Sequence, residues 1–132
     1  MRVQGQIKNQ KVVILVDTDS THNFVGPAIV KKGGYTVHSI ASLPVTVANG
    51  EKLHAREICS GLQVVIQRET IISDFFVLPL RGCDMVLRVQ WLVTVGSILW
   101  DFFHLTMQFT MENRCICWSS MQAGQLVMMT RK

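Results

Sequence analysis

The chain has 132 residues, enough for one domain with a sizeable core, and its 48% hydrophobic and 17% charged residues exclude a disordered or fibrous chain. The formal net charge is +4, but the cations are scattered, with Lys31-Lys32 and Arg131-Lys132 as the only basic doublets, so we expect no nucleic-acid partner. The longest apolar run, residues 12–16, is far too short to span a bilayer, and no signal sequence opens the chain. We therefore expect no membrane partner and an intracellular, cytoplasmic location.

Short apolar runs rich in Val, Ile, Leu and Phe, separated by Gly, Asn and Pro, predict a mainly β protein. Residues 8–10 suit the turn of a first hairpin. Asn49-Gly50 is the strongest hairpin signal, because both residues accept a positive φ at low cost. The candidate strands cover residues 3–7, 11–17, 43–48, 52–59, 62–67, 70–78, 97–101, 105–111 and 114–118.

Two short helices are expected among these strands. Residues 27–32 begin with a proline and end with two lysines, and Gly33 can cap the C-terminus of that helix. A second helix over residues 89–95 has low intrinsic propensity because it contains three valines, so tertiary packing would have to stabilise it. The apolar rhythm ends near residue 118, which predicts one domain over residues 1–118 and a C-terminal tail over residues 119–132.

The cysteine spacing does not favour a metal site. Zinc sites usually combine two pairs of ligands, whereas here Cys115 and Cys117 are separated by one residue and no second pair occurs. Residues two apart in a strand share a face, so these thiols can lie side by side without a metal. We expect four free thiols, including Cys59 and Cys83, and no metal or other cofactor.

Asp17 is the candidate catalytic residue. It ends the apolar run of residues 12–16 and is followed by Thr18, Asp19 and Ser20. A carboxyl group at the end of an apolar strand is partly desolvated, which suits a group that must act as both acid and base. From these residues alone, the alternative that Asp17 only ends a strand and begins a turn stays open.

The segment over residues 13–25, Val-Ile-Leu-Val-Asp-Thr-Asp-Ser-Thr-His-Asn-Phe-Val, resembles the active-site segment of a known protease family. This is the retropepsin-like aspartic protease domain of plant Ty3/gypsy-type retrotransposon polyproteins. Further segments match that family in order, and the resemblance covers roughly residues 1–118. These segments are residues 45–53, 74–80, 82–87, 90–92, 96–102 and 105–109.

The resemblance implies a closed, mainly β barrel that works as a homodimer, because each chain brings one catalytic aspartate. Two such carboxyl groups share a proton, activate a water and hydrolyse an extended peptide or polyprotein. By resemblance Asp17 is catalytic, and Thr18 and Ser20 belong to the active-site loop. The hairpin around Asn49 and Gly50 is a candidate flap over the substrate.

Two departures from the family pattern each replace a glycine. Asp19 stands after the hydroxyl residue, where a side chain meets backbone conflict and adds a carboxylate beside the catalytic pair. Arg88 stands where the family has a glycine behind the active-site loop. The resemblance thus implies an aspartic endopeptidase that is weakened or inactive. The alternative is a non-catalytic remnant that dimerises or binds peptides. Whether Asp19 and Arg88 compensate each other as a pair stays open.

Overall fold

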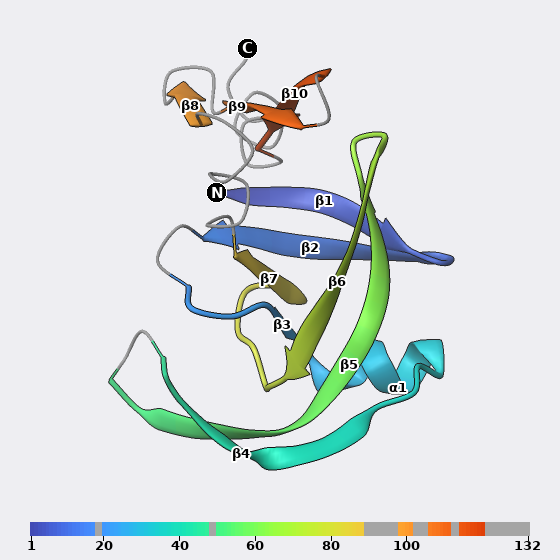
Figure 1. Cartoon of the computed structure of the whole chain (residues 1–132), viewed down its shortest axis with the longest axis vertical. Coiled ribbons are helices and arrows are strands. Elements are labelled where there is room, and N and C mark those ends of the chain that lie inside the picture. The colour runs from blue at the N-terminus through green and yellow to red at the C-terminus, as the bar shows by residue number, and fades with distance from the viewer. Residues whose placement is uncertain (18–19, 48–49, 89–97, 102–105, 112–113, 121–132) are drawn as a thin grey trace.

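The computed structural model describes residues 1–17, 20–47, 50–88, 98–101, 106–111 and 114–120 (Figure 1). The described residues form ten strands and one short helix, which confirms the mainly β prediction. The elements are β1 (Arg2–Ile7), β2 (Gln10–Asp17), β3 (Phe24–Val25), α1 (Pro27–Gly33), β4 (His38–Thr46), β5 (Lys52–Ile66), β6 (Glu69–Val77), β7 (Met85–Arg88), β8 (Ile98–Asp101), β9 (Thr106–Met111) and β10 (Arg114–Ser119).

Most of the strands belong to one sheet that closes on itself. Its order is β1-β2-β7-β3-β6-β5-β4, and β1 also pairs with β5 through Gln6 and Val65. This last pairing joins β1, β2, β7, β3, β6 and β5 into a ring, and β4 extends from the outer edge of β5. The closed β arrangement expected from the sequence is therefore present, as a ring of paired strands.

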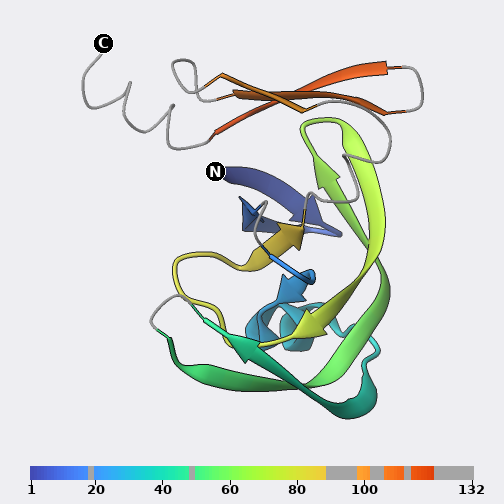
Figure 2. The same cartoon turned by 60° about the vertical axis from the view of Figure 1, so that its left-hand side comes forward.

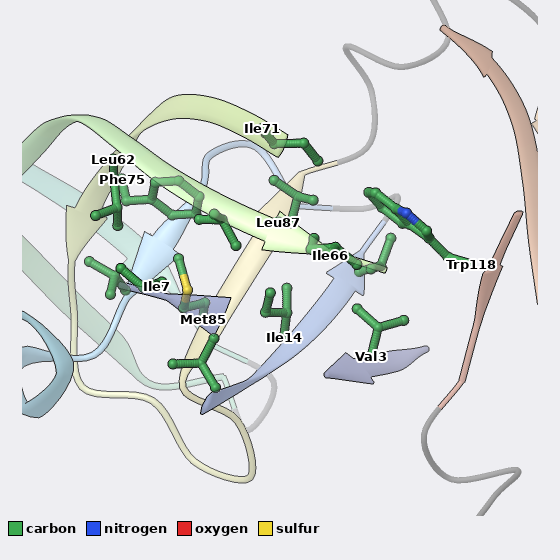
Figure 3. Close-up of a cluster of buried hydrophobic side chains, with 14 of the residues drawn as sticks. Val3, Ile7, Ile14, Leu62, Ile66, Ile71, Phe75, Met85, Leu87 and Trp118 are labelled. Carbon is green, nitrogen blue, oxygen red and sulfur yellow. The ribbon is translucent and has the colours of Figure 1, made fainter. Parts of the chain in front are cut away.

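The core lies inside this ring. Alternate residues of β1 and β2 are buried, which is the period of two that a strand with one inward face requires. The buried side chains meet those of β5, β6 and β7 (Figure 3). Trp118 of β10 reaches the same cluster, where its ring packs edge-on against Phe109 with centroids 4.9 Å apart.

A separate sheet in the order β10-β9-β8 covers one end of the ring (Figure 2). Polar contacts fix it to the turn between β5 and β6. The amide of Gln67 donates to the carbonyl of Ser119 at 2.9 Å and accepts from the Ser119 N–H at 3.0 Å. Arg114 forms a two-point ion pair with Glu69, with its shorter contact at 2.8 Å.

The helix prediction over residues 27–32 is confirmed by α1, which has proline in its first turn. The capping glycine is Gly34, at φ 65°, and not Gly33 as expected; its N–H reaches the carbonyls of the last turn. The expected helix over residues 89–95 lies outside the described residues. In the described part of the chain, no helix has the length and hydropathy that a membrane span needs.

The strands differ from the sequence predictions in several features, and β4 begins at His38 although the expected strand covered residues 43–48. The expected strands over 52–59 and 62–67 are one strand, β5, with a bulge in which Ser60 and Gly61 lie opposite Asp74. Gly61 adopts φ 63° there and donates its N–H to the Asp74 carboxylate at 2.8 Å. The short strands β3 and β7 were not predicted. They are too short to show a periodic pattern, and β7 forms because it pairs with β2 and β3.

Candidate active site

Asp17 is the last residue of β2, and Arg88 is the last residue of β7. The two strands are parallel, and their register pairs Asp17 with Arg88 and Leu15 with Val86. Their carboxyl ends point to the same side of the ring (Figure 1). Paired residues of neighbouring strands share a face, and Val16 and Leu87 are buried on the opposite, core face. The side chains of Asp17 and Arg88 therefore emerge on one face, next to each other.

The side chain of Asn23 joins neighbouring segments of the chain next to Asp17 and Arg88. It is almost fully buried, and its side-chain oxygen accepts the backbone N–H of Arg88 at 2.7 Å. Its amide nitrogen donates to the hydroxyl of Ser73 at 3.0 Å and to the carbonyl of Asp74 at 3.3 Å. Asn23 thus joins the segment after Asp17 to β6 and to the end of β7. No pattern in the sequence pointed to this role of Asn23.

Of the expected active-site loop, Ser20 is described, while Thr18 and Asp19 lie outside the described residues. The Ser20 hydroxyl donates to the carbonyl of His22, which holds the loop in a local turn. The His22 ring packs edge-on against Phe76, with centroids 5.1 Å apart, and contacts the Thr21 hydroxyl through Nδ1 at 2.8 Å.

Apolar side chains surround Asp17 and Arg88 on this face. A second hydrophobic cluster, separate from the main core, has four buried members, Phe24, Ala55, Leu78 and Val86. Partly buried side chains from β2, β6, the β4–β5 hairpin and the segment between β6 and β7 pack against it, namely Leu15, Leu43, Val45, Leu53, Phe76, Leu80 and Cys83. Because Leu15 precedes Asp17 by two residues, both side chains lie on this face. An extended chain with apolar side chains would find matching surface here.

The β4–β5 hairpin confirms the hairpin expected at Asn49-Gly50. Its strands pair up to Thr46 and Lys52, and the Val47 N–H donates to the Glu51 carbonyl at 2.9 Å. Gly50 has φ 85°, the left-handed conformation that the glycine permits. Asn49 lies outside the described residues. The hairpin contributes Leu43, Val45 and Leu53 to the apolar face of Asp17.

Among the described residues of this face, Asp17 supplies the carboxyl group for acid and base chemistry. Within the described residues, no cluster of three or more His, Cys, Asp or Glu side chains could hold a metal ion. Burial raises the pKa of the Cys83 thiol, and the Asp84 carboxylate adds to this while Arg2 opposes it. Burial likewise raises the pKa of the Cys59 thiol, with Asp74 adding to the shift. Neither thiol is therefore an activated nucleophile.

Comparison with known proteins agrees with this geometry. The sequence profile of a family described as retroviral aspartyl protease matches residues 3–114. Among curated proteins, none matches the chain. The retroviral protease-like domain of Ddi1 from Leishmania major superposes with a TM-score of 0.60 at 14% sequence identity, covering 87% of this chain and 90% of that one. The simian foamy virus (mac) protease gives 0.47 at 16% identity, covering 74% and 100%. The likeness to the Ddi1 domain confirms the retropepsin-like fold.

Proposed function

Since this chain belongs to the retroviral aspartyl protease family, we propose that it is a retropepsin-like aspartic endopeptidase domain with impaired catalysis. It derives from a retrotransposon polyprotein, forms a homodimer and binds extended peptides. Asp19 and Arg88 weaken or abolish hydrolysis. The observation that carries this proposal is the pairing of Asp17 with Arg88 on the apolar face.

A homodimer is needed because each chain supplies a single catalytic aspartate, Asp17. Two copies of Asp17 that meet at a two-fold axis share one proton, since two neighbouring carboxylates cannot both ionise cheaply. The ionised carboxylate then takes a proton from water, whose oxygen attacks the peptide carbonyl, and the protonated carboxyl group donates its proton to the substrate. The apolar face and the β4–β5 hairpin would hold an extended peptide against this pair.

Arg88 disturbs this chemistry by its position. Its side chain emerges beside that of Asp17, so a dimer would bring two guanidinium groups to the catalytic pair. The long side chain also occupies space where the loop must approach the partner subunit.

Asp19 disturbs the same chemistry by its charge and its Cβ. It lies two residues after Asp17 in the sequence, at the family's glycine position. A non-glycine residue forced into an unusual backbone conformation costs about 1–3 kcal/mol. An added carboxylate also favours protonation of both catalytic groups, which leaves no base to activate water.

The test is peptide hydrolysis by four proteins: the natural chain, Asp19→Gly, Arg88→Gly and the double variant. We expect little cleavage by the natural chain, partial recovery in each single variant and the most in the double variant at mildly acidic pH. Cleavage by the double variant should be blocked by a transition-state mimic for aspartic proteases and lost with Asp17→Asn. Robust, Asp17-dependent cleavage by the unaltered chain would contradict impairment.

The peptidase requires a dimer, whereas the alternative, a non-catalytic remnant that dimerises or binds peptides, does not depend on one for catalysis. Sedimentation over a wide concentration range should show a dimer whose fraction rises with concentration. A strict monomer that also lacks activity in the double variant would favour the remnant. If each single variant is less stable than the natural chain, Asp19 and Arg88 act as a compensating pair, because removing one charge strands the other.

A further inference from the structure

A groove of about 670 Å³ lies at the end of the ring where the β1–β2 turn, the segment after α1 and β5 meet. Lys8, Gly34, Tyr35, Gly61 and Gln63 are among the residues that line it. The groove is remote from the candidate active site. Lys8 lies two residues before the start of β2 and Asp17 ends it, and a strand of eight residues is roughly 25 Å long.

The groove follows a gap in the strand pairing of β5. On the side of β5 that faces away from β6, β4 pairs with residues up to Ile58, and β1 pairs at Val65. Between these residues, no described strand pairs with this side of β5. Continuing the β1 register would place Lys8 opposite Gln63, but Lys8 has φ 51° and the chain turns away into β2. A segment of β5 is thus left with one open edge.

The hairpin geometry shows which backbone groups face the gap. Gln67 and Arg68, both with positive φ, form a two-residue turn closed by the pair of Ile66 and Glu69. The closing pair of such a turn is hydrogen-bonded, and hydrogen-bonded pairs alternate along an antiparallel ladder. The N–H and C=O groups of Gln63, three residues before Ile66, therefore point away from β6. They point into the groove.

The charge of the groove favours an anionic ligand. None of its lining residues is acidic, and the Asp74 carboxylate nearby accepts the N–H of Gly61. The Lys8 ammonium lies 4.4 Å above the centre of the Tyr35 ring, and Lys31 and Lys32 are exposed just before the groove-lining Gly34. The Tyr35 hydroxyl is buried and has no hydrogen-bond partner among the described residues.

We propose that this groove binds an acidic segment of a partner protein in extended conformation, which adds as a strand to the open edge of β5. The backbone of the segment would pair with the N–H and C=O groups of Gln63, as in other cases of strand addition to an exposed edge. Its carboxylates would lie near Lys8 and the end of α1. This site is separate from the proposed peptidase site and does not depend on catalysis.

The probe is a short fluorescein-labelled peptide of alternating Thr and Glu, followed by fluorescence anisotropy. Gln63→Pro removes the N–H that faces the groove, whereas Gln63→Ala keeps it. Proline is tolerated on an edge whose N–H makes no ladder bond. We expect Gln63→Pro and Lys8→Glu to weaken binding at least about fivefold and Gln63→Ala and Asp17→Asn to leave it unchanged. Equal binding by Gln63→Pro and the natural chain would overturn the proposal.

Two further measurements use the unaltered protein, so they do not depend on how a variant folds. A Thr–Lys peptide, and a Thr–Glu peptide methylated at alternate backbone nitrogens, should each bind at least about fivefold more weakly than the Thr–Glu peptide. Hydrogen exchange at the Gln63 amide should slow when the Thr–Glu peptide is added. Unchanged exchange at Gln63, or equal binding of the three peptides, would also overturn the proposal.

Discussion

The backbone N–H of Arg88 donates to the side-chain oxygen of Asn23 at 2.7 Å, so the end of β7 is held to the segment that follows Asp17. The same amide group donates to Ser73 and to the carbonyl of Asp74. One buried side chain therefore sets the positions of three chain segments around the candidate catalytic carboxyl group. Arg88 keeps this bond although its side chain departs from the family glycine, because the bond uses only its backbone.

Replacing Asn23 should destabilise the whole fold. Asn23→Ala leaves the Arg88 N–H and the Asp74 carbonyl without this partner, and unsatisfied buried groups cost about 1–3 kcal/mol each. We expect a loss of about 2–4 kcal/mol in the free energy of unfolding, measured by urea denaturation. Ser73→Ala is the matched control and should cost about 1 kcal/mol, because it removes one of these bonds. Equal losses in both variants would contradict a central role for Asn23.

The bulge in β5 should depend on the backbone freedom of Gly61. A Cβ added at this residue would meet no atom within 4 Å, but φ is +63°. Gly61→Ala should therefore cost about 1–2 kcal/mol through backbone strain alone. Gly61→Asn should cost less, because asparagine enters this conformation more readily than alanine. Thermal unfolding of both variants measures the difference, and a larger loss for Asn would show that steric contact decides the outcome.

The four cysteines should separate into two classes of reactivity. Cys115 and Cys117 are exposed on β10, whereas burial raises the pKa of Cys59 and Cys83. Since the thiolate is the reactive form, a disulfide reagent at neutral pH should modify Cys115 and Cys117 quickly and the others slowly. Mass spectrometry after brief labelling identifies the modified residues. Rapid labelling of Cys59 in the folded protein would contradict its burial.

The raised thiol pKa values also predict how the free energy of unfolding changes as the pH rises. A group whose pKa is higher in the folded state than in the unfolded state releases its proton more easily on unfolding. The contribution of Cys59 and Cys83 to the free energy of unfolding is therefore constant at pH values well below the ordinary thiol pKa, about 8.5. This contribution declines as the pH rises above that value. Replacing both with alanine should remove this decline in urea denaturation at alkaline pH.

The sequence predicted those parts of the fold that local pattern determines. The strands with alternating burial, the Asn49-Gly50 hairpin and α1 appear where periodicity and turn residues placed them. The short strand β7 was missed because its formation depends on distant partners. The Asp84 carboxylate accepts the Val13 N–H at 2.8 Å and brings this segment beside β2.

The residues of the candidate site also fall into those that a local pattern identifies and those that depend on distant parts of the chain. Asp17 was identifiable because it ends a strand within a family motif, but its neighbour on the same face, Arg88, is 71 positions away and needed the β2–β7 register. Asn23 carried a weak signal as a polar residue beside the apolar pair Phe24 and Val25. The groove beside Gln63 carried none, because it arises where two distant hairpins fail to pair. Whether the ring of strands closes without a gap depends on segments that are far apart in the chain, so no local pattern predicts the groove.

Trp118 should hold the β8–β10 sheet to the ring. Its side chain is fully buried in the core cluster of the ring, and its indole N–H has no hydrogen-bond partner among the described residues. Trp118→Ala should reduce the free energy of unfolding by about 3–5 kcal/mol, because it leaves a large cavity at the junction. Trp118→Phe should lose much less, since it keeps most of the ring volume and removes a buried donor without a partner, which by itself costs about 1–3 kcal/mol.

Urea denaturation gives the two losses, and hydrogen exchange shows where they act. In Trp118→Ala, amides of β9 and β10 should lose protection before those of β2 and β6, because the contacts of Gln67 and Arg114 alone cannot replace the apolar contact. Equal losses in the two variants would mean that the indole edge, and not the ring volume, stabilises the junction.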